Sequence, residues 1–405
     1  MYLTQWFEPE PNIVKGLAFV RALEAAGHTV TVVTGLPNYP HGRLYPGYRL
    51  RTIQRETLDG VQVIRLPLYP SHDRSSLRRS LNFLSFFAAA LVYGLMRRER
   101  YDLAYVYHPP ITVGLAAALA GLVRRLPFVL DVQDLWPDTI AATGMAGAGR
   151  LTGVLGALCR FVYRRASAVI VQSDGMRRTL IARGVPAAKV TAILNWADVG
   201  EANEMAAPAP AGRRRFAVVY GGNFGRAQAL ETVVDAAALL GRQRDDIEIQ
   251  LYGDGVEEAS LRAHAALSEP TALGFEPRVA KDRIVAVFAA ADGLLLHLRP
   301  DPLFAITIPS KTQFYLAMGR PIVAGVAGEA ADLLRESGAA LVTAPGDAAA
   351  LAHAIAELAE LTAERRAEMG RAGRRFYRER LSFEAGLRRT LGVVEGTYAD
   401  HRRRR

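Results

Sequence analysis

The pattern that most restricts the fold is an alternation of short apolar runs with segments of helical periodicity, which occurs twice along the 405 residues. In the first half, the apolar runs predict strands at residues 2–5, 29–34, 61–66, 103–107, 128–132, 168–172 and 190–193. Helical periodicity occupies the intervals at 13–26, 77–98, 112–124, 150–165 and 175–183. Strands that alternate with helices predict a parallel sheet covered on both faces.

The alternation restarts in the second half, with expected strands at 216–220, 247–252, 272–275, 293–296, 322–324 and 340–342 and a last helix at 383–398. Residues 200–215, "GEANEMAAPAPAGRRR", have no period and indicate a linker. We therefore predict an α/β chain with a domain at 1–200, a linker at 201–215 and a second domain at 216–375. The remaining residues, 376–405, are expected to form a helix that packs back on the first domain and ends in a basic tail.

Charge and cysteine content restrict the partners and the compartment. The net charge is +10, and its arginines cluster beside apolar helices, which suits an anionic membrane surface or phosphate-bearing substrates. No aromatic-interleaved basic strand or recognition helix appears, so we expect no nucleic-acid partner. The single cysteine, Cys159, excludes an internal disulfide and favours a reducing cytoplasm, where we expect it to be a buried thiol.

One segment raises the question of membrane contact. Residues 80–96, "SLNFLSFFAAALVYGLM", lie between two arginine pairs and are at the lower length limit for crossing a bilayer. Crossing, lying in the membrane interface and ordinary burial all remain open at this stage. The opening residues, "MYLTQWF", lead directly into a strand, so no signal peptide is expected.

Three turns of the second half follow expected strands. "VVYGGNFGRAQ" contains Gly222, Gly225 and Arg226, "LYGDG" contains Gly253 and Asp254, and "IPSKTQF" places a lysine in the first turn of a helix. A helix start disfavours a cation unless an anion lies there, so Lys311 indicates an anionic ligand. The glycines of each turn alone could serve only the geometry of that turn. Three such turns at one edge of a sheet favour a binding site for a nucleotide diphosphate.

The sequence lacks the motifs that are typical of several other classes of ligand-binding site. The phosphate-binding pattern G-x-x-x-x-G-K-[ST] is absent, and no G-x-G-x-x-G follows the first strand. No D-x-D pair or His/Cys spacing suits a metal, so we expect neither a metal nor a cofactor. The charge of a diphosphate would then be neutralised by Arg226, Lys311 and helix amides.

Together with "YLAMGRPIVAG", these turns resemble the GT-B glycosyltransferases of family 4. That resemblance implies two Rossmann-like doubly wound domains facing a cleft. "GLPNYPHGRLYPGYRL" and "DVQDLWPDTIAATGM" are similar to the bacterial branch that adds N-acetylated amino sugars during O-antigen and capsule assembly, often named L-fucosamine transferases.

The resemblance assigns the nucleotide-sugar donor to the second domain. It implies that the loop from Gly222 to Gly225 approaches the diphosphate and that Gly253 and Asp254 line the cleft. The further donor-binding positions that it implies are Asn223, Gln228, Phe275, Ser310 and Gln313.

The sequence departs from the family at two positions. Relatives carry two glutamates eight positions apart, and the matching residues here are Ile306 and Phe314. Neither can accept a hydrogen bond from a hydroxyl group. Gln313 and Asp301 are candidates for those two tasks, and a different binding mode remains open.

For the acceptor side, the resemblance points to residues that follow strands of the first domain. Asp134, Trp136 and Asp138 follow one strand, and His108 ends another. The aspartates could instead be helix caps and the tryptophan could be core.

The first turn of the chain supplies the remaining acceptor candidates. They are Glu8 (or Glu10), Lys15 and Gly16. Acidic residues there could equally serve an ordinary helix start.

The resemblance implies a retaining, metal-independent transfer of an N-acetylated amino sugar from a UDP-sugar to a lipid-linked saccharide. The expected catalytic residues are Asp134, His108, Asp301, Arg226 and Lys311. The expected location is the cytoplasmic face of the bacterial inner membrane, as a peripheral protein. A UDP-sugar epimerase of the same architecture and a non-catalytic member that binds nucleotide or lipid are the alternatives.

Overall fold

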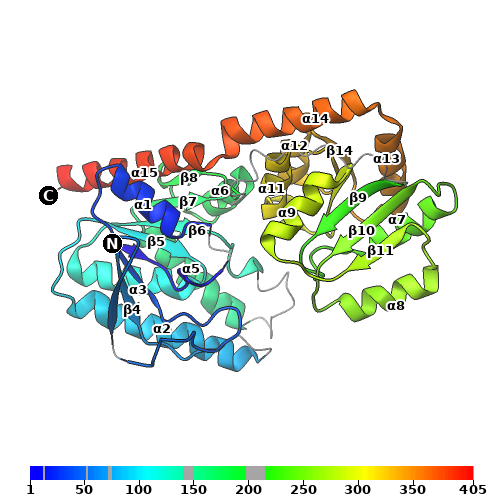
Figure 1. The fold of residues 1–405 in the computed structure, drawn as a ribbon. Helices are drawn as coiled ribbons and strands as arrows, with labels where there is room; N and C mark the ends of the chain where they lie inside the picture. The colour runs from blue at the N-terminus through cyan, green and yellow to red at the C-terminus, as the bar shows by residue number, and fades with distance from the viewer. Residues whose placement is uncertain (12–13, 52, 72–74, 140–149, 198–214, 405) are drawn as a thin grey trace. The chain divides into compact units, whose positions relative to one another are not determined.

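A computed structural model describes residues 1–11, 14–51, 53–71, 75–139, 150–197 and 215–404. The chain divides into two compact units. Unit 1 comprises Met1–Leu194 and Gly386–Arg405, and unit 2 comprises Asn195–Ala385 (Figure 1). The linker expected at 201–215 lies outside the described residues except for Arg215, and residues 140–145 of the "DVQDLWPDTIAATGM" segment also lie outside them.

The described part of unit 1 contains one eight-stranded sheet, in the order β3-β4-β2-β1-β5-β6-β7-β8. Its strands are β1 (Tyr2–Leu3), β2 (Thr31–Gly35), β3 (Gln54–Leu58), β4 (Val61–Leu66), β5 (Ala104–His108), β6 (Phe128–Val132), β7 (Ala168–Val171) and β8 (Val190–Ala192). All neighbours are parallel except β3 and β4. The order reverses between β1 and β5, and such a switch point is where doubly wound sheets bind ligands.

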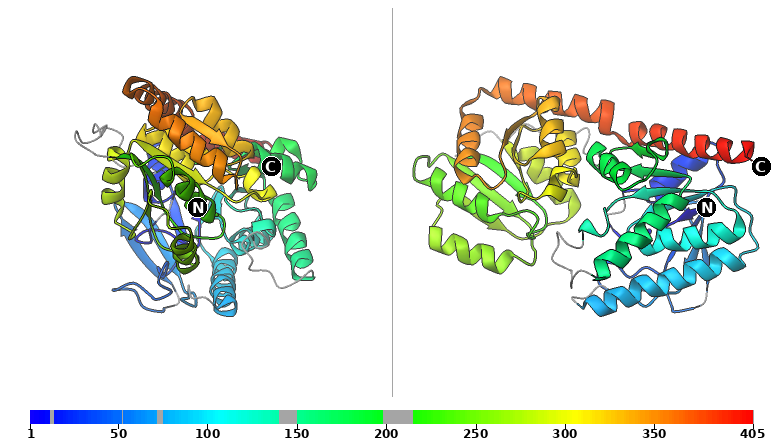
Figure 2. Two further views of the ribbon diagram at one scale, coloured as in Figure 1. Left: turned by 90° about the vertical axis from the view of Figure 1, so that its right-hand side faces the viewer. Right: turned by 180° about the vertical axis from the view of Figure 1, so that it is seen from behind.

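Helices cover both faces of this sheet. They are α1 (Leu17–Ala25), α2 (Ser76–Met96), α3 (Ile111–Arg124), α5 (Arg150–Arg165), α6 (Asp174–Ala182), the short 3₁₀ helix η1 (Ala187–Lys189) and α15 (Phe383–Arg403). Figures 1 and 2 show α2 and α3 on one side of the sheet and α1 with α15 on the other. The carboxyl ends of the strands at the switch point are therefore left between two helix layers.

Strand β3 corrects the expectation of a purely parallel sheet. It pairs antiparallel with β4, in the register Leu58↔Val61 to Gln54↔Arg65. The connection is the two-residue turn Asp59-Gly60, in which both residues have positive φ (45° and 89°). An Asp-Gly pair between two short strands is a strong hairpin signal, so "ETLDGVQV" could have revealed this edge strand.

The described part of unit 2 contains a six-stranded parallel sheet in the order β11-β10-β9-β12-β13-β14. Its strands are β9 (Phe216–Gly221), β10 (Ile247–Tyr252), β11 (Leu273–Glu276), β12 (Gly293–His297), β13 (Ile322–Gly325) and β14 (Ala340–Thr343). This is the doubly wound order, and its switch point lies between β9 and β12. The sequence predicted every one of these strands to within one residue at each end.

The helices of unit 2 are α7 (Glu231–Gly241), α8 (Glu258–Ser268), α9 (Lys281–Ala290), α10 (Pro302–Ala305), α11 (Ser310–Met318), α12 (Gly328–Ser337), α13 (Ala348–Glu360), α14 (Ala363–Phe376) and the π-helical turn η3 (Tyr377–Leu381). A buried apolar cluster joins β9 and β10 to α7, α8 and α13. Phe288 of α9 and Tyr315 of α11 pack edge to face beside β9, with ring centroids 5.2 Å apart. The apolar cluster packs on one part of the sheet and the aromatic pair lies beside β9. Together they fix the positions of the loops at the ends of β9 and β12.

Candidate functional site

In unit 2, the loops after β9, β10 and β12 carry most of the candidate donor-binding residues. The first two loops are packed backbone against backbone, because Gly222 N donates to Tyr252 O (2.8 Å) and Phe224 N donates to Asp254 O (2.7 Å). Gly222 and Gly253 have φ of 144° and 156°, a region that favours glycine. A Cβ on Gly253 would overlap the carbonyl oxygen of Gly222. These glycines are therefore required for the close approach of the two loops.

Lys311 lies beside this glycine loop, in the first turn of α11. Its Nζ donates to the hydroxyl of Tyr220 (2.9 Å) and lies 4.6 Å from the centre of that ring. A Cβ on Gly222 would lie 2.5 Å from Cε and 2.7 Å from Nζ of Lys311, so the lysine crosses directly over the loop. Among the described residues, no carboxylate pairs with it.

Burial lowers the pKa of Lys311 to about 8. A partly buried ammonium group with only a phenol as partner is energetically unfavourable, and an anionic ligand would compensate it. The helix start adds backbone N–H groups that favour the same anion. The phosphate role expected for Lys311 stays a prediction, and these surroundings give it a physical reason.

The other polar candidates of the β9 and β10 loops are engaged within the protein. Arg226 pairs with Glu257 (Nε to Oε1, 3.0 Å), and its side chain is exposed. The Gln228 side chain accepts a bond from Gly225 N (3.2 Å), which closes the turn. Asp254 pairs with Arg278 (3.2 Å) at the surface. These side chains shape the loop, whereas Lys311 is directed over it.

Asn223 and Phe275 complete the donor candidates near this loop. The carbonyl of Asn223 accepts from the hydroxyl of Tyr220 (2.8 Å), so Tyr220 joins Lys311 to the loop. Phe275 lies on β11, half-buried, with its ring centroid 6.5 Å from that of Phe224 and the guanidinium of Arg262 over it at 4.8 Å. Tyr220 was not among the predicted site residues, although its place at the end of β9 could have suggested it.

Ile306 and Phe314 occupy the two positions at which relatives carry glutamate. Phe314 packs edge to face on Phe288, with centroids 5.9 Å apart, and Ile306 ends α10. Ser310 is the first residue of α11.

The proposed substitutes have structural tasks. Asp301 caps α10, because its Oδ1 accepts from Leu303 N (2.8 Å). Gln313 is buried, and with its amide nitrogen oriented as the donor it bonds the carbonyls of Pro309 (2.8 Å) and Ser310 (3.2 Å). Its amide nitrogen is therefore committed to its own helix start, and the interpretation of Gln313 as a ribose ligand needs a rearrangement.

A pocket of about 260 Å³ lies next to Gly225, between the starts of α7 and α8. Its lining includes Glu231, Glu257 and His264. The two carboxylates disfavour a phosphate in this pocket. In the described part of the chain, no group of three or more His, Cys, Asp or Glu side chains could hold a metal ion.

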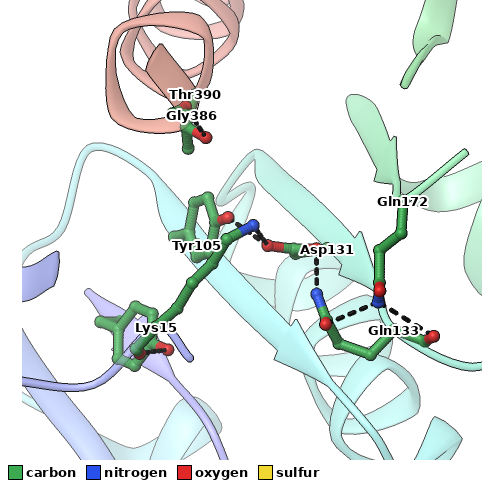
Figure 3. Close-up of polar contacts among 8 residues, drawn as sticks. Lys15, Tyr105, Asp131, Gln133, Gln172, Gly386 and Thr390 are labelled. Atoms are coloured by element: carbon green, nitrogen blue, oxygen red, sulfur yellow. Dashed lines mark hydrogen bonds and ion pairs between the residues drawn. The ribbon is translucent and has the colours of Figure 1, made fainter. Parts of the chain in front are cut away.

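In unit 1, the acceptor candidate Lys15 belongs to a buried polar network beside the switch point (Figure 3). Lys15 forms a buried ion pair with Asp131 on β6, and the hydroxyl of Tyr105 donates to the same carboxylate oxygen. Gln133 donates to Asp131 Oδ1 (2.7 Å), and Gln172 donates to Gln133 Oε1 (2.6 Å). Lys15 is 1% exposed, so its charge is neutralised inside the protein.

This network corrects the acceptor role expected for Lys15. No local pattern pairs Lys15 with Asp131, which lies within the apolar run "FVLDV" far along the chain. The pair instead joins the loop after β1 to the carboxyl end of β6, and it fixes the position of α1.

Glu8, Glu10 and Gly16 also serve the loop after β1. Glu8 Oε1 accepts from Leu17 N (2.8 Å), so it caps α1, which begins after Gly16. Glu10 is 3% exposed and accepts from Phe7 N (3.1 Å), Asn38 N (2.7 Å) and Tyr39 N (2.8 Å). Burial raises the pKa of Glu10 to about 7. Glu10 is therefore turned inward, where it joins this loop to the loop after β2.

His108 ends β5 and is fully buried, and neither ring nitrogen has a hydrogen-bond partner among the described residues. Its ring lies under the first turn of α3, with Cδ2 3.8 Å from the position of a Cβ on Gly114. Burial lowers the pKa of His108 to about 4. The expectation that it faces an open ligand space is wrong for this conformation, because α3 covers it.

The segment after β6 keeps one candidate carboxylate available. Asp134 and Trp136 are half-buried, and burial raises the pKa of Asp134. Asp138 instead pairs with Arg183 (2.7 Å), which anchors the segment to α6. Asp134 is therefore the better of the two aspartates for contact with a substrate.

Comparisons with known proteins bear on this arrangement. Residues 17–196 match the family described as "Glycosyl transferase 4-like domain", and residues 215–360 match "Glycosyl transferases group 1". The chain is a glycosyltransferase of the GT-B fold. It is 28% identical over 341 residues to the Escherichia coli (strain K12) protein named "Putative colanic acid biosynthesis glycosyl transferase WcaI", covering 81% of each chain.

Solved structures share this GT-B fold over nearly the whole length. Anabaena Alr3699/HepE in complex with UDP has a TM-score of 0.66 at 16% identity, with 98% of this glycosyltransferase and 99% of that chain covered. Sucrose-phosphate synthase from Thermosynechococcus elongatus has a TM-score of 0.65 at 19% identity, with 95% and 93% covered. At these identities the likeness concerns the fold.

Proposed function

We propose that this glycosyltransferase moves a glycosyl group, an N-acetylated amino sugar, from a UDP-sugar to a lipid-linked saccharide in the assembly of a bacterial surface polysaccharide. The observation that carries the proposal is Lys311, partly buried at a helix start and directed over the glycine loop at the switch point of unit 2. The relative named for colanic acid biosynthesis supports the polysaccharide, and the UDP and UDP-glucose complexes of HepE support the nucleotide.

Lys311 and the glycine loop would act on the leaving diphosphate. In a retaining transfer without a protein nucleophile, the acceptor hydroxyl attacks from the face that the nucleotide leaves, and the departing phosphate takes the proton. The protein then contributes position and charge stabilisation. The ammonium of Lys311, the first N–H groups of α11 and the Asn223 N–H would supply that stabilisation without a metal ion, because the N–H groups of Gly222, Phe224 and Gly225 already donate within the protein.

The rest of the substrate would be held by groups that the family pattern does not specify. Phe314 and Ile306 cannot bind the ribose hydroxyls, and Asp301 is already a helix cap. The half-buried ring of Phe275 is the candidate surface for the base. In unit 1, Asp134 is the candidate ligand for the acceptor saccharide, and the Lys15–Asp131 pair holds the neighbouring loop in place.

The experiment is a measurement of UDP release when purified protein is mixed with a panel of UDP-sugars and polyprenyl-diphosphate saccharides. We expect release that depends on both substrates and persists in excess EDTA. Lys311→Met should remove most of the turnover while keeping the fold. Absence of turnover across the panel, together with no UDP binding by calorimetry, would overturn the proposal.

The two glycosyltransferase domain matches favour transfer over the epimerase and non-catalytic alternatives. The same assay separates them. Conversion of a UDP-sugar without any acceptor would indicate epimerisation. Intact glycan synthesis in cells that carry Lys311→Ala would indicate a non-catalytic role.

A further inference from the structure

Helix α2 of unit 1 presents an apolar outer face along its whole length. Leu77, Leu81, Leu84, Val92 and Met96 have exposed fractions of 70%, 44%, 54%, 53% and 76%. They recur at intervals of three, four or eight residues, and the alanine in the eight-residue interval, Ala88, is exposed too. This spacing places them in one stripe on a helix. We call these five residues and Ala88 the outer stripe of α2.

The opposite face of α2 is part of the core of unit 1. Phe86, Ala90 and Tyr93 are buried against it. Asn82 is 2% exposed, accepts from Gln5 Nε2 (2.6 Å) and donates to Asn38 Oδ1 (3.2 Å) and Tyr69 O (2.7 Å). The helix thus has one face that belongs to the fold and one that has no packing partner within the described residues of unit 1.

This arrangement decides among the three possibilities that the sequence left open. The segment Leu77–Met96 is long and apolar enough to cross a membrane. Crossing would separate Asn82 from Gln5 and Asn38 and leave the Asn82 side chain unpaired in hydrocarbon. Ordinary burial fails as well, because the outer stripe is exposed. Lying in the membrane interface satisfies both faces.

The charges around the stripe specify the kind of surface. Helix α2 contains no Asp or Glu, its first turn contains Arg78 and Arg79, and Arg98 and Arg100 follow its end. The neighbouring helix α3 adds exposed Val123 (69%), and Arg124 of α3 donates to Arg97 O (3.2 Å) at the end of α2. Apolar side chains bracketed by arginines complement an anionic lipid surface.

We propose that the outer stripe of α2 docks in the plane of an anionic lipid bilayer, with its leucines in the acyl boundary and the flanking arginines on the headgroups. The inference rests on the proposed function to the extent that a lipid-linked acceptor gives the docking its purpose. Its physical basis is independent of the donor site, since it uses no residue of unit 2.

The test is flotation of the purified full-length protein with vesicles of phosphatidylcholine alone or with one-third phosphatidylglycerol. We expect binding to the anionic vesicles that weakens as salt is raised. Leu84→Gln combined with Val92→Gln should lower the partition coefficient about tenfold or more, because each removes apolar area from the bilayer contact. The matched control is Leu267→Gln on α8, an 87% exposed leucine outside the stripe, and it should bind like the wild type.

Three further measurements make the outcome decisive. A carbonate wash should release the protein, and retention would overturn the in-plane arrangement. If the double variant changes the sedimentation coefficient but not vesicle binding, the stripe is an interface between copies and the proposal is wrong. UDP binding should be the same in the wild type and both variants. A wild type that binds UDP but not vesicles would refute the docking proposal and leave the proposed function standing. Vesicle binding with neither UDP binding nor turnover would instead refute the proposed function.

Discussion

Lys311 illustrates how a single side chain can indicate a ligand through its unfavourable surroundings. Its ammonium is partly buried, donates to the hydroxyl of Tyr220 and has no carboxylate partner among the described residues. It also lies at a helix start, where the dipole opposes it. Removing the lysine should therefore not harm the fold. It should harm the binding of an anion, and these two effects can be measured separately.

The first prediction concerns Lys311→Met. We expect the affinity for UDP, measured by calorimetry, to fall about 10- to 100-fold, which corresponds to one charged hydrogen bond of about 1.5–3 kcal/mol. The thermal midpoint should stay the same or rise, because a poorly compensated ammonium is removed. Arg244→Met is the control, since Arg244 pairs with Asp246 just before β10, at the opposite end of the strands. A loss of affinity in the control as well would mean that general charge, not Lys311, attracts UDP.

The second prediction is a pH dependence with the same origin. With its pKa lowered to about 8, Lys311 loses its proton above that pH in the free protein, whereas a bound diphosphate favours the charged form. The affinity for UDP should thus fall as pH rises above 8, by at most about tenfold per pH unit. The curve of Lys311→Met should lack this fall. Parallel curves would show that the lysine does not meet the diphosphate.

The third prediction concerns His108. Its folded pKa of about 4 lies below that of an unfolded histidine, so between pH 6.5 and 4 the unfolded state binds the extra proton. Stability should fall as pH drops through this window, by at most about 1.4 kcal/mol per pH unit from this residue. Glu10 has the opposite effect, because its pKa is raised to about 7 in the folded protein. Its contribution to the stability of the fold is therefore lost as pH rises toward 7.

Urea unfolding of the wild type and His108→Gln at several pH values separates these two groups. Glu10 is present in both proteins, so the difference in slope belongs to His108. Between pH 4.5 and 6.5 the contributions of His108 and Glu10 oppose each other, so the slope of unfolding free energy against pH should be more negative in the variant than in the wild type, by at most about 1.4 kcal/mol per pH unit. Equal slopes would indicate that water or a ligand reaches His108 in solution.

At the scale of elements, the glycine-containing loops after β9 and β10 of unit 2 form one packed unit. The loops after β9 and β10 exchange backbone hydrogen bonds, so a change in one moves the other. The Lys311 side chain rests on the first of them at Gly222. A glycine that touches no ligand can therefore control the position of the loop that would bind one.

The fourth prediction follows from this packing. Gly253→Ala should destabilise unit 2 by about 1–3 kcal/mol from its φ of 156° alone, and overlap with Gly222 O should add to this. It should also weaken UDP binding. Gly274→Ala on β11 is the matched control, since the nearest atom to its new Cβ is Ile249 O at 4.0 Å. Thermal unfolding and calorimetry give both readouts, and equal effects of the two variants would contradict the loop argument.

At the scale of the whole molecule, helix α15 carries the chain from unit 2 into unit 1. It begins at Phe383, and from Gly386 onward its residues belong to unit 1. Thr390 is fully buried, Arg389 donates to Ala192 O on β8 (2.6 Å), and Glu395 lies 3.5 Å from His28. Residues 386–405 are therefore part of the fold of unit 1.

The fifth prediction tests that assignment. Deletion of 386–405 should reduce the hydrogen-exchange protection of β7, β8 and α1 while that of β9 and β10 is kept. The physical reason is the loss of the half-buried face of α15, formed by Leu387, Leu391, Val394 and Tyr398. Deletion of the basic end alone, 402–405, is the control and should change neither unit. Equal loss in both units would show that α15 stabilises the molecule as a whole.

Local periodicity was enough to predict most of the secondary structure. The two alternating patterns correctly gave the two sheets, because period and turn residues act over a few positions. The one strand that was missed, β3, had its hairpin signal in Asp59-Gly60. The unusual place of Lys311 was also visible in the sequence, since helix-start chemistry is local.

Tertiary packing decided which polar side chains remain available. Lys15, Glu10, His108 and Gln313 all looked like site residues, and all four are buried, three of them in hydrogen bonds or ion pairs. Helix α2 likewise shows its two faces only in the folded chain. What packs over a side chain comes from distant parts of the sequence, such as Asp131 for Lys15 or α3 for His108, and no local pattern encodes it.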